Sequence, residues 1–188
     1  MAFCYVLIPF KDGFDVLAGC LESLLPQLSE GVDVVLVDDG SSPEASGHPV
    51  LQPFLDNGQI HLLRHDTNQG PAQARNTGLA WCREAGAEIV ILLDSDCLAQ
   101  SGFIDAHVRL HKAHPDRNCI GGAIQGRGNG VWAALDALMS WFSSIPGTPA
   151  HTVNEPYHLP STNMSLKLNT FGPGDVFNPR LKTGEDVA

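Results

Sequence analysis

Short apolar runs alternate with amphipathic segments along the first half of the chain. Runs rich in β-branched residues predict buried strands at residues 5–8, 32–37, 60–63 and 88–93, the first of which we expect to stop at Pro9. Apolar residues at helical spacing predict a helix over residues 14–28, and an early proline predicts another over residues 71–84. Strands that alternate with helices are typical of right-handed crossover units. The pattern therefore predicts an α/β fold, with a Rossmann-like, mostly parallel sheet flanked by helices on both faces.

Beyond residue 101 the pattern is less regular. We expect a helix to about residue 112 and a strand near residues 119–125. Residues 131–145 are apolar and aromatic and lie between a glycine-rich and a proline-rich stretch. Packing against the sheet would explain this segment. Packing is the interpretation we prefer, and the alternative is a helix that presents its aromatic side chains to a lipid-linked acceptor or a membrane surface (Trp132, Trp141 and Phe142).

Composition limits the classes of protein to consider. With 188 residues, of which 43% are hydrophobic, the chain can bury one substantial core, so we expect residues 1–188 to form one domain. The apolar runs are shorter than a membrane span and the start lacks the basic segment of a secretion signal, which favours a cytoplasmic location. A net charge of −10 argues against a nucleic-acid partner. Five scattered cysteines without a Cys-x-x-Cys pair argue against disulfides and structural zinc.

Carboxylates follow two of the predicted strands. Asp38 and Asp39 close one strand, and Asp94 and Asp96 follow another. Open α/β sheets bind ligands at the carboxyl ends of their strands, and carboxylate oxygens suit Mg²⁺ or Mn²⁺. Capping of a turn or of the next helix would also explain each pair, and Asp38 in particular could fix the turn into Gly40.

Residues 68–79 combine a helix start with an arginine one turn in. Both features favour an anion nearby, although Arg75 could form a solvated ion pair instead. The small residues Ala72, Ala74 and Gly78 fit a helix that packs tightly on the sheet.

Three histidines lie at spacings of four and three residues on the predicted helix that ends near residue 112. His107, His111 and His114 could form a metal-binding face, but no fourth ligand is evident. We therefore expect an ordinary polar helix surface.

In their order along the chain, these motifs resemble glycosyltransferase family 2, which has the GT-A fold. The nucleotide-sugar half of that family is similar to the segments at 8–9, 37–41, 68–79 and 93–96. Residues 161–167 look like the family's segment beneath the acceptor, and residues 184–186 look like its catalytic acidic motif. The resemblance implies a nucleotide-sugar-binding half over about residues 1–100 and an acceptor-side half over about residues 101–188.

The resemblance also implies roles for single residues. The nucleotide side would include Pro9, Asp38, Asp39, Arg75 and Asp94. Pro9 and Asp39 would lie beside the nucleobase, and Arg75 near the base or the phosphates. Asp94 would face the ribose and, with Asp96, a divalent Mn²⁺ or Mg²⁺ ion. Asp38 is the weaker member of this set.

On the acceptor side, Asp186 is implied as the general base, and Glu185 would organise the acceptor pocket. The expected reaction is a metal-dependent, inverting transfer of a sugar from a nucleoside-diphosphate sugar to a hydroxyl acceptor, which could be a glycan or lipid-linked. Two alternatives stay open. One is a nucleotide-sugar-binding module without transfer activity. The other is a nucleotidyltransferase, for which residues 9–13 are a poor version of the expected glycine-rich, basic signature.

The chain departs from the family pattern in two places. Phe10-Lys11-Asp12 follows the first strand where the family often has an aromatic residue and an asparagine, which leaves the base and the donor open. Only Val187 and Ala188 follow the acidic motif, whereas relatives continue with a helix. We therefore expect a fragment that lacks part of the acceptor side.

Overall fold

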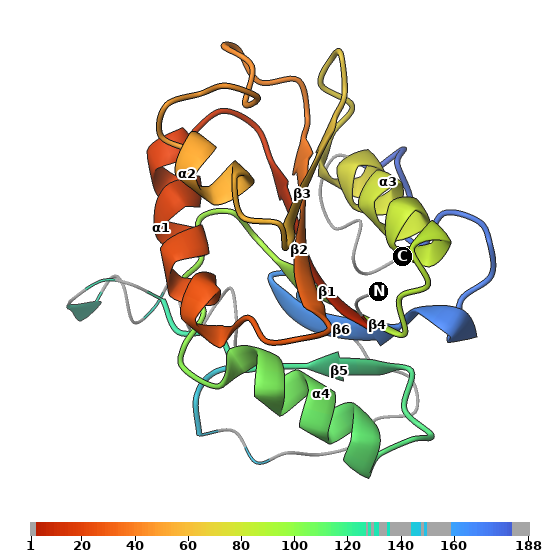
Figure 1. Cartoon of the computed structure of the whole chain (residues 1–188). Helices are drawn as coiled ribbons and strands as arrows, with labels where there is room; N and C mark the ends of the chain where they lie inside the picture. Colours follow the sequence, from red (N-terminus) through yellow and green to blue (C-terminus); the bar gives the residue numbers. More distant parts are fainter. Residues whose placement is uncertain are drawn as a thin grey trace.

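The computed structural model describes residues 3–126 and 159–181, and also residues 128, 130, 131, 135, 144–147 and 149. Its centre is a six-stranded sheet in the order β3-β2-β1-β4-β6-β5 (Figure 1). The strands are β1 Cys4–Phe10, β2 Val32–Asp38, β3 Ile60–Arg64, β4 Ile89–Leu93, β5 Cys119–Gly121 and β6 Asn163–Lys167. β1 pairs in parallel with β2 and β4, and β2 with β3, whereas β6 is antiparallel to both of its neighbours. The expected mostly parallel α/β sheet is confirmed.

Helices cover both faces of the sheet (Figure 1). The helices α1 (Phe14–Leu24), α2 (Gln52–Leu55) and α4 (Phe103–Ala113) pack on one face, and α3 (Pro71–Glu84) packs on the other. The crossover from β1 through α1 to β2 runs opposite in direction to the crossover from β3 through α3 to β4. Because such crossovers are right-handed, the two helices fall on opposite faces.

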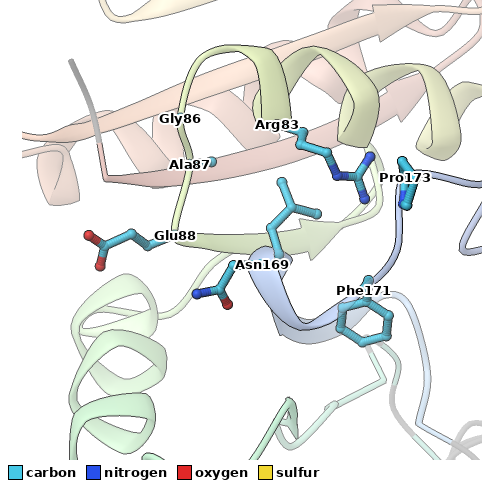
Figure 2. Close-up of a pocket in the computed structure, with 8 residues that line it drawn as sticks. Arg83, Gly86, Ala87, Glu88, Asn169, Phe171 and Pro173 are labelled. Carbon is cyan, nitrogen blue, oxygen red and sulfur yellow. The ribbon is translucent and has the colours of Figure 1, made fainter.

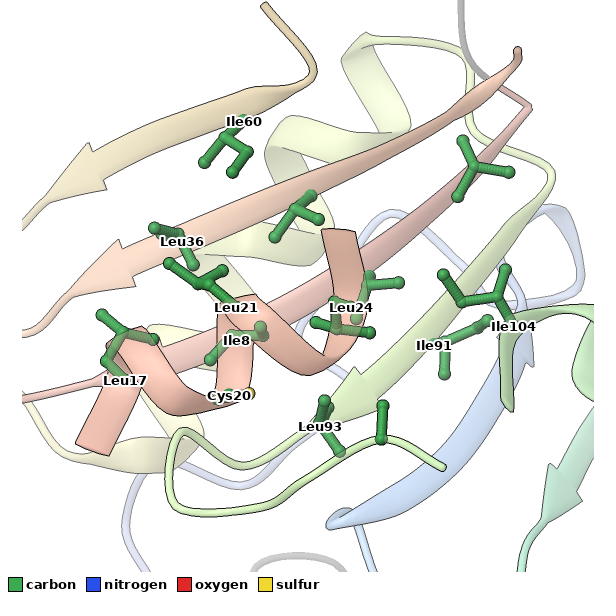
Figure 3. Packing of buried hydrophobic residues seen from close by; sticks show 14 of the residues in the cluster. Ile8, Leu17, Cys20, Leu21, Leu24, Leu36, Ile60, Ile91, Leu93 and Ile104 are labelled. Atoms are coloured by element: carbon green, nitrogen blue, oxygen red, sulfur yellow. The ribbon is translucent and has the colours of Figure 1, made fainter. Parts of the chain in front are cut away.

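Strand alternation divides the core into two layers. Ile8 and its even-numbered neighbours in β1 face the leucines of α1, as Figure 3 shows for Leu17, Leu21 and Leu24. Leu7 faces the other way, toward α3, where Gly78 takes the contact. A Cβ atom at Gly78 would lie 2.2 Å from Cδ1 of Leu7. The predicted tight packing of α3 on the sheet is therefore confirmed.

Two predicted boundaries near prolines differ from the structure. β1 continues through Pro9 to Phe10. The Phe10 carbonyl accepts a hydrogen bond from Asp39 N on the β2 side, so the backbone groups of Pro9, one residue earlier, point to the β4 side. The ladder with β4 ends at Leu7, so the absent N–H of Pro9 interrupts no pair. α1 ends at Leu24 rather than at residue 28, and a 3₁₀ helix, η1 (Leu25–Gln27), follows it because Pro26 cannot continue the α-helical ladder.

The second half contains a shorter strand and an unexpected one. β5 ends at Gly121, four residues before the predicted end at residue 125. β6, which the apolar pattern did not predict, lies between β4 and β5 and leads into a 3₁₀ helix, η2 (Leu168–Thr170). Trp132, Trp141 and Phe142 lie outside the described residues. Among the helices that the structure describes, none has both the length and the apolar composition needed to cross a bilayer.

The expectation of a polar surface on α4 is wrong for two of its three histidines. His107 and His111 are buried against β6, and only His114 is exposed. Nδ1 of His107 lies 2.8 Å and Nε2 of His111 2.9 Å from the hydroxyl of Ser165, and Nε2 of His107 lies 2.8 Å from Oδ1 of Asn163. Both histidines are core residues. His107 has a partner at each ring nitrogen, whereas Nδ1 of His111 is buried without a hydrogen-bond partner among the described residues.

Candidate active site

The acidic residues of the two strand ends lie at one edge of the sheet. β1 pairs with β2 on one side and with β4 on the other, so one strand separates the two acidic pairs. Their strand ends are therefore two spacings apart, roughly 10 Å. The chain leaves β1 toward β2, whereas β4 lies on its other side, which makes this edge a topological switch point. Such points are where open α/β sheets bind ligands.

Asp39 is a buried carboxylate that the neighbouring loop holds in place. Its Oδ1 accepts hydrogen bonds from Gln69 N at 2.8 Å and faces Nδ1 of His65 at 2.7 Å. Its Oδ2 accepts from Gly70 N at 2.8 Å. Gly40 makes the close approach of the two loops possible, because it adopts a φ of 76° and a Cβ there would lie 2.7 Å from Asn68 N. Asp39 is thus fixed at the edge of the sheet.

Asp38 stabilises the loop that follows β2. The carboxylate is 0% exposed and accepts from Ser41 N at 2.8 Å and from Ala45 N at 3.4 Å. Arg64 forms an ion pair with it. This geometry agrees with the alternative in which Asp38 fixes the turn into Gly40. We therefore leave Asp38 out of the proposed ligand contacts.

Asp94 is held from both sides. Arg75 donates to its Oδ1 at 2.8 Å, and the Thr162 hydroxyl donates to its Oδ2 at 2.7 Å. Arg75 is a buried residue, with its guanidinium 5.6 Å from the centre of the Phe177 ring, so its ion pair is not the solvated one that most helical arginines form. The side chain of Asp94 remains 32% exposed. An oriented carboxylate with open surface can accept a hydrogen bond from a ligand.

Asp96 differs from the other three carboxylates because it is exposed. Among the described residues, its side chain has one hydrogen-bond partner, the thiol of Cys97, which donates to Oδ1 at 3.6 Å. Burial raises the pKa of Cys97 to about 12, so this thiol stays neutral and leaves the carboxylate as the available anion. Magnesium and manganese sites with phosphorylated ligands commonly use one or two carboxylates and complete their shell with phosphate and water oxygens. Asp96, with Asp94 two residues before it, fits such a site.

No larger metal cluster supplements these carboxylates in the part of the chain that the structure describes. There, no group of three or more His, Cys, Asp or Glu side chains is placed to hold an ion. His107 and His111 do not form such a group, because the side chains that contact their ring nitrogens are Ser165 and Asn163 rather than carboxylates or thiols. A divalent ion at the carboxyl edge would therefore need ligands from a substrate in addition to those from the protein.

The loop after β1 is tied to the loop after β2. Asp12 N donates to the hydroxyl of Ser41 at 2.7 Å, and Ser42 N donates to Oδ1 of Asp12 at 2.9 Å. The Ser42 N–H and the neighbouring Lys11 lower the pKa of Asp12 below its ordinary value. Pro9 is buried and is the penultimate residue of β1, so its backbone lies near the carboxyl edge of the sheet. Asp12 therefore links the loop after β1 to the loop after β2 beside the carboxyl edge of the sheet.

Asn76 anchors the segment that precedes the predicted catalytic motif. Its Nδ2 donates to the carbonyl of Phe177 at 2.7 Å, while Oδ1 accepts from the N–H groups of Phe177 and Val176. Arg75 and Asn76 are adjacent on α3. Arg75 contacts Asp94 at the carboxyl edge of the sheet, and Asn76 contacts the segment at Val176 and Phe177. Glu185 and Asp186, the predicted catalytic residues, lie outside the described residues.

Sequence reasoning missed three residues that position this site. His65, Thr162 and Asn76 contact partners that are 26, 68 and 101 residues away along the chain, respectively. Local patterns carry no signal for such contacts. Thr162 and Asn76 lay in segments that the family resemblance had singled out, at 161–167 and 68–79, whereas His65 lay in none of them.

A hollow of about 440 Å³ lies at the opposite edge of the sheet (Figure 2). It is lined where β4 begins and β6 ends, by Arg83, Gly86, Ala87, Glu88, Leu168, Asn169, Phe171 and Pro173. None of the predicted site residues contributes to it. We place the candidate site at the carboxyl edge, because the fixed carboxylates lie there and the hollow has no comparable group.

Several known proteins are similar to this chain in sequence or in fold. A pre-mycofactocin glycosyltransferase from Mycobacterium tuberculosis is 28% identical over 188 residues, which cover 97% of this chain and 37% of that protein. TarS 1-349 from S. aureus, solved in complex with UDP-GlcNAc, has a TM-score of 0.73 at 21% identity, with 99% of this chain and 51% of TarS 1-349 covered. The mannosyltransferase PcManGT from Pyrobaculum calidifontis, in complex with GDP-Man and Mn²⁺, has a TM-score of 0.69 at 18% identity, with 98% and 49% covered.

The likeness to these solved structures confirms the expected GT-A fold. The chain spans 37% of the length of the Mycobacterium relative and about half of the two solved chains. The family model for glycosyl transferase family 2 matches residues 5–170, which is most of the chain. The chain therefore belongs to glycosyl transferase family 2.

Proposed function

We propose that the protein is a metal-dependent, inverting glycosyltransferase that moves a sugar from a nucleoside-diphosphate sugar to a hydroxyl acceptor. One observation carries the proposal: three carboxylates flank β1 at the switch point, two of them fixed by protein donors and the third exposed. Asp39 and Asp94 are fixed, and Asp96 is exposed. Family membership favours glycosyl transfer over nucleotidyl transfer.

The fixed carboxylates suit the uncharged parts of a nucleotide. Asp39 would accept a hydrogen bond from the base, and Asp94 would accept one from a ribose hydroxyl. The positive charge of Arg75 lies 2.8 Å from Asp94 and offsets its negative charge, which lowers the repulsion that a diphosphate would meet at this edge. Asp39 and Asp94 would thus contact the base and the ribose of the nucleotide sugar, which are uncharged.

Asp96, with Asp94 beside it, would hold the divalent ion. A bound Mn²⁺ or Mg²⁺ would offset the negative charge that develops on the leaving diphosphate. The neighbouring structure with GDP-Man and Mn²⁺ and the one with UDP-GlcNAc support a nucleotide-sugar donor, and the first supports a divalent ion.

Catalysis is assigned to the predicted acidic motif. Asp186 would take the proton from the attacking hydroxyl, with Glu185 organising the acceptor pocket, and one displacement would invert the anomeric carbon. We assign donor binding to about residues 1–100 and the acceptor side to about residues 101–188. A lipid-linked acceptor stays a proposal that depends on the aromatic segment at 131–145.

A thermal-shift panel tests the donor proposal. A ligand that binds only the native state raises the melting temperature, so UDP-, GDP- and dTDP-sugars are compared with and without Mn²⁺. We expect at least one nucleotide sugar to raise the melting temperature, and to do so more strongly with Mn²⁺. A panel in which no nucleotide sugar changes the melting temperature with or without Mn²⁺ would contradict the proposal.

A further inference from the structure

The two oxygens of Asp39 differ in how much hydrogen-bonding capacity they retain. A carboxylate offers about four in-plane lone-pair sites, two on each oxygen. Oδ1 is occupied twice, by Gln69 N at 2.8 Å and by His65 Nδ1 at 2.7 Å. Oδ2 is occupied once, by Gly70 N at 2.8 Å. Asp39 thus retains one site for a ligand donor, and that site is on Oδ2.

The chemistry of the contacts fixes the direction of the His65 hydrogen bond. An ionised carboxylate can only accept, so the Nδ1 that faces it carries the hydrogen. On the other side of the ring, Nε2 lies 2.9 Å from the hydroxyl of Thr77 on α3. The ring is 7% exposed and is held at both nitrogens. His65 therefore occupies a lone pair of Oδ1 permanently rather than as a mobile surface group.

Nucleobases differ in how many donors their pairing edge presents. Uracil and thymine present one imide N–H between two carbonyl groups. Guanine presents a ring N–H and an amino N–H side by side, and these two donors match both oxygens of a carboxylate in a fork. With Oδ1 filled, Asp39 can pair with one of guanine's donors and leaves the other unpaired. An imide N–H is also a stronger donor than an exocyclic amine, which favours uracil or thymine over adenine or cytosine.

We infer that the donor nucleotide carries uracil or thymine, and that His65 determines this preference by occupying Oδ1 of Asp39. The inference rests on the proposed function, in which Asp39 faces the base. It assigns His65 a specificity role through Asp39, without contact to the base. An unpaired donor in a desolvated site lowers affinity by on the order of tenfold to a hundredfold, which sets the expected discrimination against guanine.

Titration calorimetry with five nucleotides in the presence of Mn²⁺ tests the base preference. UDP, GDP, ADP and CDP share the ribose and the diphosphate, so differences in their Kd values report on the base, and dTDP against UDP reports on the 2′-hydroxyl and the 5-methyl group together. We expect UDP or dTDP to bind at least about tenfold more tightly than GDP, ADP and CDP. GDP, ADP or CDP binding as tightly as the better of UDP and dTDP would overturn the inference while the proposed function stands. If none of the five binds, both fail.

Substitutions of His65 test its role. His65→Leu removes the donor to Oδ1 and should reduce the ratio of the GDP and UDP dissociation constants by about tenfold or more, because guanine can then use both oxygens. His65→Asn keeps an N–H donor near the position of Nδ1 and should preserve the wild-type ratio. A purely structural role would weaken UDP and GDP equally in His65→Leu, and that result would overturn the assignment.

A fallback keeps the test decisive if His65→Leu does not fold. Thr77→Val removes the hydroxyl partner of Nε2 and leaves the ring and its Nδ1 hydrogen in place. Without this second hydrogen bond the ring can move away from Oδ1 of Asp39 and free that oxygen for guanine, so Thr77→Val should reduce the ratio of the GDP and UDP dissociation constants, and His65→Asn should not. An unchanged ratio in Thr77→Val, or a reduced one in His65→Asn, would count against the role of His65.

Discussion

At the scale of single residues, the four carboxylates at the sheet edge are graded by what already binds them. Asp38 has no exposed surface and several donors, whereas Asp39 retains one acceptor site. Asp94 is oriented but partly open, and Asp96 is exposed. A buried carboxylate that the protein satisfies fully has little left to offer a ligand. This gradation separates a structural aspartate from the three to which we assign donor binding in the proposed function.

The two buried histidines of α4 give the protein a specific response to acid. Burial lowers the pKa of His111 to about 4, with a further contribution from the charge of Lys167, and burial also lowers the pKa of His107. In the unfolded chain both would titrate near about 6.5. Protons therefore bind the unfolded state first as the pH falls. The stability of the neutral histidines is present above about pH 6.5 and is lost toward pH 4.

We predict that His111→Gln makes the protein's stability less sensitive to acid. Each histidine that is neutral when folded contributes a slope of up to about 1.4 kcal/mol per pH unit between the two pKa values. Urea unfolding at several pH values from about 7.5 to about 5 gives this slope. The wild type should lose more stability than His111→Gln over this range. His114→Gln, at the exposed end of the same helix, should behave like the wild type, and an equal slope in all three proteins would contradict the account.

At the scale of elements, α3 packs closely on β1, as its small residues predicted. Gly78 leaves no space for a side chain, since its Cβ would meet Leu7 at 2.2 Å. Arg75 and Asn76 lie on the same helix, so a shift of α3 would also move the contacts to Asp94 and Phe177. The packing of α3 therefore affects the position of Asp94 at the carboxyl edge of the sheet.

Gly78→Ala should destabilise the protein, although alanine is the better helix former. Overpacking of a well-packed core typically costs about 1–3 kcal/mol, which exceeds the helix-propensity gain of about 1 kcal/mol. Gly19→Ala in α1 is the matched control, because a Cβ there would meet nothing within 4 Å. It should be neutral or stabilising. Urea unfolding that shows equal effects for the two variants would refute the close packing of α3.

Elements with local determinants were predicted best. α3 begins at Pro71 and ends at Glu84, as expected, because the proline sets its start and its small residues face the sheet. α1 was predicted too long, since apolar spacing continues past Pro26 although the helical hydrogen bonds do not. β6 escaped prediction, because its pairing with β4 is long-range and Ser165 interrupts its apolar residues. The burial of His107 depends on that same strand, so it was missed as well.

At the scale of the whole molecule, the mixed sheet combines the two halves of the sequence at one site. β6 comes from the second half and runs antiparallel to β4, so its first residue pairs with the last residue of β4. Thr162, which immediately precedes β6, thereby reaches the carboxylate of Asp94. A parallel strand in this position would place its start at the opposite edge. The strand direction therefore explains how Thr162, from the second half of the sequence, reaches the carboxyl edge next to Asp94.

Because the net charge of the protein is −10, a bound divalent ion would contribute more to nucleotide affinity than it would in a basic protein. An acidic surface repels polyanions, which is why we predict no nucleic-acid partner. A divalent cation on Asp96 would reverse the local sign and allow a diphosphate to bind where the protein's own field opposes it. Nucleotide affinity should therefore depend strongly on the metal.

The most direct test of this account is the effect of Mn²⁺ on UDP affinity in Asp96→Asn, measured by titration calorimetry. In the wild type, Mn²⁺ should tighten UDP binding, and Asp96→Asn should lose most of this gain because a neutral amide is a weak ligand for a hard cation. Asp105→Asn is the control, since Asp105 is exposed on α4 and pairs with Arg109. It should behave like the wild type. If Asp96→Asn keeps the full Mn²⁺-dependent gain in UDP affinity, the proposed metal site at the carboxyl edge is contradicted.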